Sequence, residues 1–285
     1  MNRASEWKNR KIGLVLSGGG AKGAYQIGMF RALEELGLAD QICTISGTSI
    51  GALNGMAYAA KGVGGVRRMM FGFGEQMAVV KQQTSHEQIT ASREAVSRGE
   101  VTVEQFVTDP AFSEYDAGVF SAFLEELLPD ALLKTYSQSL YACAYSLNGC
   151  RPEYFHLNGR TAQQQRDLIL ASASLPFVFP PVKYQDSYYL DGGVVPQVCG
   201  SMAEKADKIP LKPIISEPID AILVNFLNPA DQIDTSGVPK QTKYLELRPS
   251  RPLEKYPGEG TLDFSEDRLR SHEALGYLDT MEVFR

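Results

Sequence analysis

The chain has 285 residues, of which 44% are hydrophobic and 22% are charged, so it can bury a substantial core. Its formal net charge of -6 at pH 7 argues against nucleic acid as a partner and provides no general attraction to anionic membranes. The first residues lack an apolar secretion signal and no apolar run is long enough to span a bilayer, so we expect a soluble, cytoplasmic protein.

A glycine-rich turn follows the first predicted strand. Ile12 to Leu16 is a short aliphatic run, typical of a strand covered on both faces of a parallel sheet. The next residues have the spacing G-x-G-x-x-G, with glycine at Gly18, Gly19, Gly20 and Gly23. Without Cβ atoms, such residues let backbone N–H groups approach a ligand. Helical periodicity then runs from Ala24 to a C-cap at Gly37, so the turn lies at a helix N-terminus, which favours negative charge.

A second turn repeats this plan. Ile42 to Ser46 is another strand-like run, and Gly47-Thr48-Ser49-Ile50-Gly51 matches the G-x-S-x-G nucleophile elbow. The helix predicted after Ser49 places its hydroxyl at a helix N-terminus, with the Ile50 N–H as a donor to a developing oxyanion. Alone, the first motif could bind a dinucleotide, but the next strand ends at Ser46 rather than at the required acidic residue. Both motifs together predict an oxyanion cradle and a nucleophile.

The middle of the chain changes character after a break predicted at residues 62–65. Residues 67–80 combine basic with soft apolar side chains and form either a lipid-facing cap or a helix packed on the core. Residues 81–104 are predicted as a surface helix with loops, in which His86 is solvated. Residues 119–133 have an apolar helical face, with Pro129 bending or ending the helix.

A hairpin and a further helix lead to an acidic residue. Strands are predicted at 140–147 and 153–157, joined through Asn148-Gly149, and His156 on the second is interpreted as structural. Thr161 is a plausible N-cap for a helix that ends near Ala173. Prolines then impose extended backbone, and an alternating segment leads to Asp191-Gly192-Gly193.

The remaining elements complete an α/β pattern. Helices are predicted at 202–206 and 263–284 and strands at 221–226 and 244–247, with a proline-rich connection at 208–218. The cysteines lack C-x-x-C spacing and suit free thiols; they are Cys43, Cys143, Cys150 and Cys199. Of these, Cys143 and Cys150 could meet across the hairpin. Without a histidine cluster or calcium-loop pattern, we expect no metal and no cofactor.

The segments SGGGAKGAYQIGMFRALEELG and ISGTSIGALNG resemble the patatin-like phospholipase family, and ASASLPFVFPP resembles a further family segment beside the active site. The resemblance implies an α/β, three-layer αβα fold with a central, mostly parallel sheet. It implies one domain over residues 1–285 with a cap or insertion at about 62–135. It also implies that the aspartate of the D-G-G motif completes the site. This chain departs from many relatives at Ser17, where they have aspartate, and at Lys22, where arginine is frequent.

The implied reaction is hydrolysis of a lipid carboxylic ester, of the phospholipase A or lysophospholipase type, through an acyl-serine. Ser49 is the expected nucleophile and Asp191 the general base. The predicted oxyanion donors are Gly18, Gly19, Gly20 and Ile50. Supporting positions are Lys22, Gly23, Gly47, Gly51, Gly192 and Gly193. Lys22 either anchors the loop, attracts a phosphate head group or pairs with a carboxylate. The expected partner is a phospholipid or another acyl-ester lipid, reached by transient peripheral membrane contact.

Several alternatives remain open at this point. Chain order permits a Ser49-Asp191-His272 triad, but His272 shares a helical stripe with Leu269 and Leu275, where a packed imidazole is commoner. The same dyad suits a small-ester or thioester hydrolase. A protein of another class, which binds nucleotide or acts as a non-catalytic interaction module, would use the Gly18–Gly23 loop.

Overall fold

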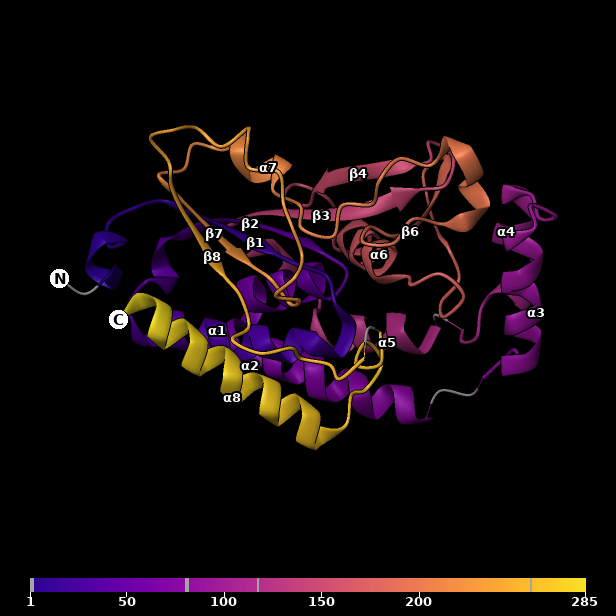
Figure 1. Ribbon diagram of the computed structural model, residues 1–285, viewed down its shortest axis with the longest axis horizontal. Coiled ribbons are helices and arrows are strands. Elements are labelled where there is room, and N and C mark those ends of the chain that lie inside the picture. Colours follow the sequence, from indigo (N-terminus) through magenta and orange to yellow (C-terminus); the bar gives the residue numbers. More distant parts are fainter. Residues whose placement is uncertain (1–2, 80–81, 117, 257) are drawn as a thin grey trace.

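The computed structural model describes residues 3–79, 82–116, 118–256 and 258–285 (Figure 1). Their strands form a mixed sheet in the order β5-β6-β3-β2-β1-β7-β8, with β4 paired to β3. The strands joined by parallel pairing are β1 (Ile12–Leu16), β2 (Ile42–Thr48), β3 (Ser139–Ser146), β7 (Ala221–Asn225) and β8 (Lys243–Leu247). Those in antiparallel pairs with their neighbours are β4 (Arg151–His156), β5 (Val182–Tyr184) and β6 (Ser187–Asp191). The predicted α/β fold class with a mostly parallel sheet is confirmed.

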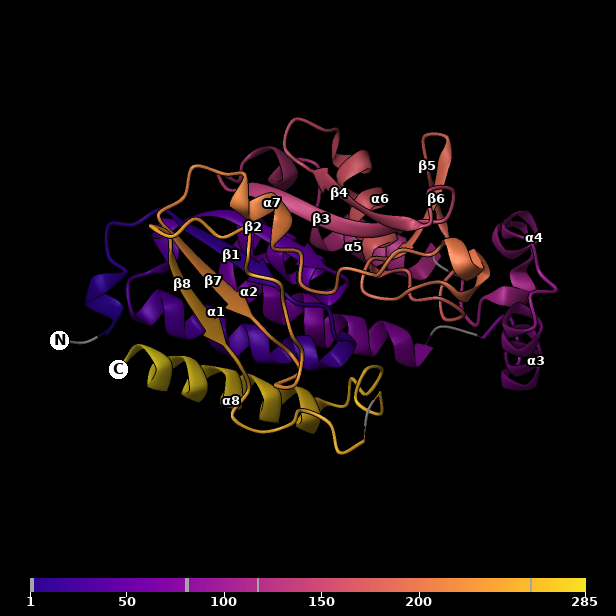
Figure 2. The same cartoon turned by 45° about the horizontal axis from the view of Figure 1, so that its top comes forward.

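Helices flank the sheet on both faces (Figures 1 and 2). One side carries α1 (Ala24–Glu35), α2 (Ile50–Val79), α5 (Gly118–Leu127), α6 (Ala162–Ala173) and α8 (Glu266–Phe284), whose buried side chains share one hydrophobic cluster. The short α7 (Lys212–Ile215) and its flanking connections cover the other face. The helices α3 (His86–Ser97) and α4 (Val103–Thr108) stand apart at one end. Short 3-10 helices occur at Arg3–Glu6, Gly20–Gly23, Ala39–Gln41, Pro110–Phe112, Leu132–Lys134 and Gln197–Met202.

Strand β1 shows why the sheet needs both layers. All five of its residues are buried. Leu14 and Leu16 pack in the cluster with α1 and α2, whereas Val15 packs in a second cluster with Ile214 of α7. Because successive side chains of a strand point to opposite faces, a continuous aliphatic run needs apolar cover on both sides. The prediction of a strand buried on both faces is confirmed.

Strand β3 joins the two halves of the sheet. Near its middle, Cys143 pairs with Thr48 at the end of β2, in parallel. The next residue, Ala144, pairs with Asp191 at the end of β6, in antiparallel orientation. The ends of two strands that are far apart in sequence are therefore held side by side by consecutive residues of a third. This register brings residues 48 and 191 into the same region.

The structure corrects several predicted boundaries. Gly62 takes left-handed φ of 63° and kinks α2, but helix resumes at once, so the predicted break at 62–65 is a kink. The helix predicted at 119–133 ends at Leu127, before Pro129, and only a 3-10 turn follows. The helix predicted at 202–206 is wrong, because the helical turns lie earlier, at Gln197–Met202.

Other predictions agree with the structure. Thr161 caps α6 through a reciprocal capping box with Gln164, and the predicted hairpin is the β3–β4 pair. The cysteines are free thiols. Within the described ranges, no helix combines the length and the apolar character needed to cross a membrane.

Helices α1 and α8 cross at close range through two glycines. A Cβ atom added to Gly28 would collide with the backbone carbonyl of Glu273, and one added to Gly276 would collide with that of Tyr25. Backbone atoms cannot move aside as the end of a flexible side chain can. The crossing therefore depends on the absence of side chains at both positions.

We expect Gly28→Ala to destabilise the protein by about 1–3 kcal/mol, the usual cost of overpacking. Gly64→Ala is the matched control, because Gly64 is an exposed residue of α2 and its added Cβ would meet no atom within 4 Å. The free energy of unfolding of that variant should rise by about 0.4–1 kcal/mol, because alanine lowers the conformational entropy of the unfolded chain. Urea unfolding measures both, and equal effects of the two variants would contradict the packing argument.

Candidate active site

The elbow serine occupies a strained turn between β2 and α2. Ser49 has φ of 57°, a left-handed value that a non-glycine residue adopts only where its surroundings enforce it. The turn is tight because a Cβ on Gly47 would collide with the backbone of Gly51, and one on Gly51 with the Leu16 carbonyl. The predicted elbow is therefore present, with its hydroxyl at the N-terminus of α2.

A serine of α6 anchors this turn. The Ser49 N–H donates to Ser172 Oγ at 2.9 Å, and Ser172 Oγ donates to the Cys143 carbonyl at 2.6 Å. Ser172 is fully buried. Sequence reasoning missed this role, and the only available signal was its place in the A-S-A-S segment, where small residues permit close packing.

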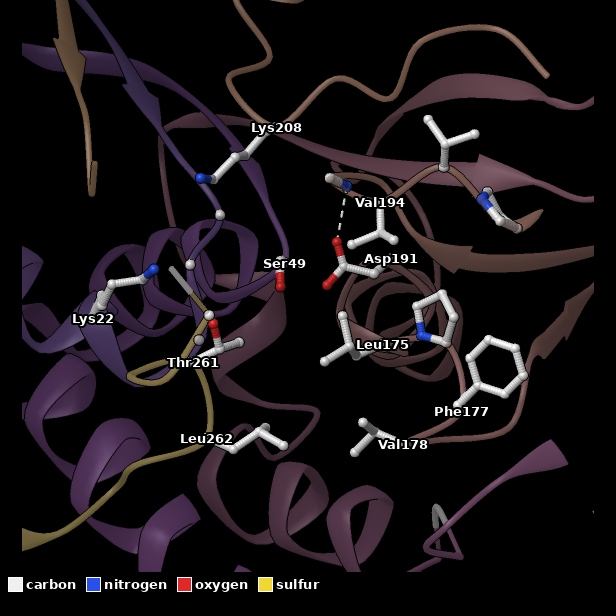
Figure 3. A pocket seen from close by; sticks show the side chains of 18 of the residues that line it. Lys22, Ser49, Leu175, Phe177, Val178, Asp191, Val194, Lys208, Thr261 and Leu262 are labelled. Carbon is white, nitrogen blue, oxygen red and sulfur yellow. Dashed lines mark hydrogen bonds between the residues drawn. The ribbon is translucent and has the colours of Figure 1, made fainter. Parts of the chain in front are cut away.

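Asp191 ends β6 and is buried, with 3% of its surface exposed. Its Oδ1 accepts a hydrogen bond of 2.8 Å from the Gly193 N–H, and its own N–H donates to the Ser174 carbonyl at 2.9 Å. Figure 3 shows the Ser49 hydroxyl and the Asp191 carboxylate facing each other across the pocket. The structure thus brings together the two side chains predicted to form the dyad.

Burial raises the pKa of Asp191 to about 6. The Ser49 hydroxyl, the Gly193 N–H and the Lys208 ammonium favour the carboxylate and oppose this rise, without cancelling it. An ordinary aspartate has a pKa of about 3.9 and is a weak base toward an alcohol. The buried carboxylate is more basic, yet it remains largely ionised at neutral pH.

The glycine-rich loop presents donors to the same space, with one difference from the prediction. The Gly18 N–H donates to the Lys208 carbonyl at 3.0 Å and is occupied. The N–H groups of Gly19, Gly20 and Ile50 have no acceptor among the described residues. Gly20 has φ of 58°, and a Cβ there would collide with the Thr261 carbonyl, which accepts the Ala21 N–H. Three of the four predicted oxyanion donors are therefore free.

A cavity of about 600 Å³ lies beside the glycine-rich loop and the dyad side chains. Of the predicted site residues, it is lined by Gly18, Gly19, Gly20, Lys22, Ser49, Asp191 and Gly193. A second cavity, of about 50 Å³, also reaches Ser49 and Asp191 and includes Ile50. The remaining supporting glycines line neither cavity and instead permit close packing: Gly23 against the Ile50 side chain, Gly192 against the Cys143 carbonyl, and Gly47 and Gly51 within the elbow.

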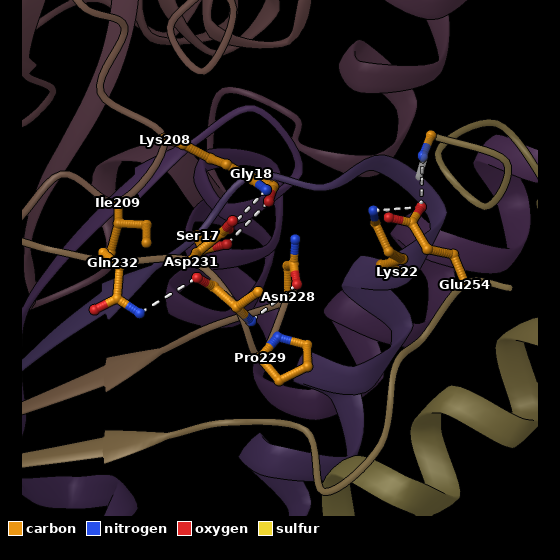
Figure 4. A network of polar contacts seen from close by, with 12 residues as sticks. Ser17, Gly18, Lys22, Lys208, Ile209, Asn228, Pro229, Asp231, Gln232 and Glu254 are labelled. Carbon is orange, nitrogen blue, oxygen red and sulfur yellow. Dashed lines mark hydrogen bonds and ion pairs between the residues drawn. The ribbon is translucent and has the colours of Figure 1, made fainter. Parts of the chain in front are cut away.

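Two lysines at the cavity are held by carboxylates (Figure 4). Lys22 Nζ lies 2.8 Å from Glu254 Oε2, so the salt-bridge alternative for Lys22 is the one observed. Lys208 Nζ lies 2.7 Å from Asp231 Oδ2. Sequence reasoning did not single out Lys208, because its connection carries no motif. Both ammonium groups are therefore paired with carboxylates of the protein.

The structure separates His272 from the other two members of the possible triad. It is buried on α8, its Nε2 lies 2.9 Å from the Leu253 carbonyl, and it lines a different cavity. Burial lowers its pKa. His86 and His156 are exposed. No group of three or more histidine, cysteine or acidic residues that could hold a metal occurs in the part of the chain described.

Comparisons with known proteins identify the family to which the sequence is similar. The model described as "Patatin-like phospholipase" matches residues 14–198. Lysophospholipase nte1 of Aspergillus terreus is 31% identical over 199 residues, covering 65% of this chain and 10% of that protein. The Aspergillus oryzae protein of that name is 31% identical over 187 residues, with the same coverage. The chain thus spans about a tenth of the length of the curated relatives it matches.

Solved structures give fainter similarity. VipD from Legionella pneumophila aligns with a TM-score of 0.45 and 14% identity, covering 96% of this chain and 66% of that one. The type III effector protein ExoU aligns with a TM-score of 0.44 and 13% identity, covering 96% of this chain and 52% of that one.

We expect Asp191→Asn to stabilise the fold at alkaline pH. The folded pKa of about 6 lies above the unfolded value of 3.8, so folding favours the protonated carboxyl. This contribution is fully present below the unfolded pKa and is lost as the pH rises through about 6. The wild type should lose about 2–3 kcal/mol relative to the variant between pH 4 and pH 8. Urea unfolding across this range measures the difference, and a constant difference would refute the raised pKa.

Proposed function

The chain belongs to the patatin-like phospholipase family, and from this premise we propose that it is a lipid acyl hydrolase that cleaves carboxylic esters through Ser49 and Asp191. One observation carries the proposal. The hydroxyl of a strained elbow serine faces a buried carboxylate whose pKa is raised to about 6, within a cavity that also presents free backbone N–H groups.

The reaction proceeds in two halves. Ser49 Oγ attacks the ester carbonyl while Asp191 accepts the hydroxyl proton, and the alcohol leaves with a proton from Asp191. The acyl group then remains on Ser49. Asp191 next takes a proton from water, which attacks the acyl-serine and releases the fatty acid. Asp191 gives this proton to Ser49 Oγ as the bond between the acyl carbon and the serine oxygen breaks, so the cycle ends with the hydroxyl and the carboxylate restored.

Backbone donors compensate for the modest basicity of a carboxylate. In this proposal the N–H groups of Gly19, Gly20 and Ile50, which line the cavities and have no acceptor among the described residues, donate hydrogen bonds to the carbonyl oxygen as negative charge develops on it. One such donor typically contributes about 2.7–4 kcal/mol to stabilisation of the transition state. Gly18 is not assigned this role, because its N–H is already used.

The segment 62–135 is the proposed cap of a single domain spanning residues 1–285. Phe73 of α2 and Phe120 of α5 line the small cavity that reaches Ser49, and Val66 and Met70 pack in the main core. Phe73 packs in the same core, which supports the interpretation of residues 67–80 as a core-packed helix, and contact of this segment with lipid is part of the proposal. Val194, Val195 and Leu262 are exposed apolar residues at the larger cavity, which suits a lipid drawn from a membrane surface during transient contact.

We expect Ser49→Ala and Asp191→Asn each to lower kcat by at least about a thousandfold, because each removes a group that reacts. His272→Gln is the control and should retain activity within about threefold, since its imidazole lies outside the cavity. Hydrolysis of a lysophospholipid measures all three. A fluorophosphonate adduct should map to Ser49 by mass spectrometry. A folded His272→Gln protein as inactive as Ser49→Ala would restore the triad.

The pH dependence of kcat/KM should report the Asp191 carboxylate. Only the ionised form accepts the serine proton, so kcat/KM should rise with pH and level off above an apparent pKa of about 6. Lys208→Met should raise this apparent pKa, because the Lys208 ammonium favours the carboxylate. Lys205→Met, at an exposed neighbouring position, is the control and should leave the profile unchanged. A profile flat from pH 5 to 8 would contradict the assignment of Asp191.

A further inference from the structure

Three basic side chains line the large cavity, but their charges are not equally available. Lys22 and Lys208 form salt bridges with Glu254 and Asp231. Arg93, on α3, also lines the cavity and has no carboxylate partner among the residues that the structure describes. Its side chain is exposed. Among the described residues that line the cavity, Arg93 is therefore the cation without a carboxylate partner, in a chain whose net charge is -6.

The Arg93 side chain contacts a residue that lines the cavity. The Arg93 guanidinium lies over the ring of Phe177, with its carbon 5.3 Å from the ring centroid. Phe177 has φ of 65°, a strained value for an aromatic residue, and its carbonyl accepts a hydrogen bond of 3.0 Å from the Glu114 N–H. Its ring packs edge-on against Phe106 of α4. The guanidinium thus contacts a cavity residue that is itself packed against α4.

The two cavities differ in character, and the reacting groups belong to both. Ser49 and Asp191 line each cavity. Arg93 lines only the larger one. Phe177 also lines the larger cavity, whereas the smaller one is lined by Phe73, Phe120, Phe179 and Phe264. A molecule whose ester lies at Ser49 can therefore reach both a small cavity rich in phenylalanine and a larger cavity that contains the Arg93 guanidinium.

We propose that Arg93 binds the phosphate of a lipid head group while the start of the acyl chain enters the aromatic cavity. This inference rests on the proposed ester hydrolysis at Ser49. The acyl chain is the apolar arm of such a substrate, so burial against phenylalanine is favourable. The head group then extends into the larger cavity, where a planar guanidinium can form paired hydrogen bonds with phosphate oxygens.

The position of Arg93 assigns it to substrate specificity rather than to the chemical step. A contact made equally in the bound substrate and in the transition state changes KM and leaves kcat unchanged. Because Arg93 is exposed, salt should screen its attraction for phosphate. The preference for a phosphate-bearing substrate should therefore fall as ionic strength rises.

A matched pair of substrates tests this role. Decanoyl lysophosphatidate and monodecanoylglycerol share an acyl ester and differ in the phosphate, and both are used below the concentration at which they aggregate. In Arg93→Gln, KM for lysophosphatidate should rise about tenfold, with kcat and all values for monodecanoylglycerol unchanged. Arg93→Lys should retain part of the preference. The control Arg98→Gln removes an exposed arginine that pairs with Glu100 just beyond α3, and should change neither substrate.

Equal effects of Arg93→Gln on the two substrates, or no effect on either, would overturn the inference. A binding measurement keeps this test separate from the hydrolysis itself. Decylglycerol phosphate and decylglycerol, both ether-linked and resistant to hydrolysis, are titrated calorimetrically into Ser49→Ala and into Ser49→Ala/Arg93→Gln. A tenfold loss confined to the phosphate compound supports the inference even if no ester is cleaved, whereas the absence of cleavage would refute only the proposed function.

Free phosphate must also be distinguished from a lipid head group. Inorganic phosphate at millimolar concentration is therefore added to the wild type during hydrolysis of monodecanoylglycerol, and in the same calorimeter. Neither inhibition nor binding is expected, because the acyl chain supplies much of the affinity. Saturable binding of inorganic phosphate that is lost in Arg93→Gln would overturn the assignment to a lipid head group.

Discussion

Removal of one carboxylate from water is the constraint on which the site depends. Asp191 has only 3% of its surface exposed, and the free energy of burying its charge raises its pKa to about 6. A backbone N–H from Gly193 and the nearby Lys208 ammonium offset part of the cost of burying the carboxylate and keep its ionised form accessible at neutral pH. The facing hydroxyl belongs to a residue with a strained backbone, because Ser49 has a left-handed φ.

The sheet explains how this pair is assembled. Thr48 ends β2, in the second strand–helix unit of the chain. Asp191 ends β6, which follows the β3–β4 hairpin and α6. Adjacent residues of β3 pair with both, through Cys143 with Thr48 and Ala144 with Asp191. The mixed pairing of the sheet therefore brings the ends of β2 and β6, from different parts of the chain, next to each other on β3.

Local patterns predicted much of this arrangement. The aliphatic run of β1, the glycine-rich turn and the elbow each have a short-range physical cause, and Ser49 and Asp191 were identifiable from their motifs. Long-range contacts were not predictable in this way. The Gly18 N–H is lost to the carbonyl of Lys208, nearly two hundred residues away. This contact leaves no local pattern in the sequence.

The carbonyl oxygen of Cys143 serves as a common reference for both halves of the site. It accepts the Ser172 hydroxyl that holds the Ser49 N–H, and Gly192 packs directly against it. Because this reference is a main-chain atom, replacing side chains along β3 would not remove it. Most amino-acid substitutions on β3 should therefore leave the hydroxyl aligned with the carboxylate. An insertion or deletion that changed the pairing register of β3 would instead displace both groups at once.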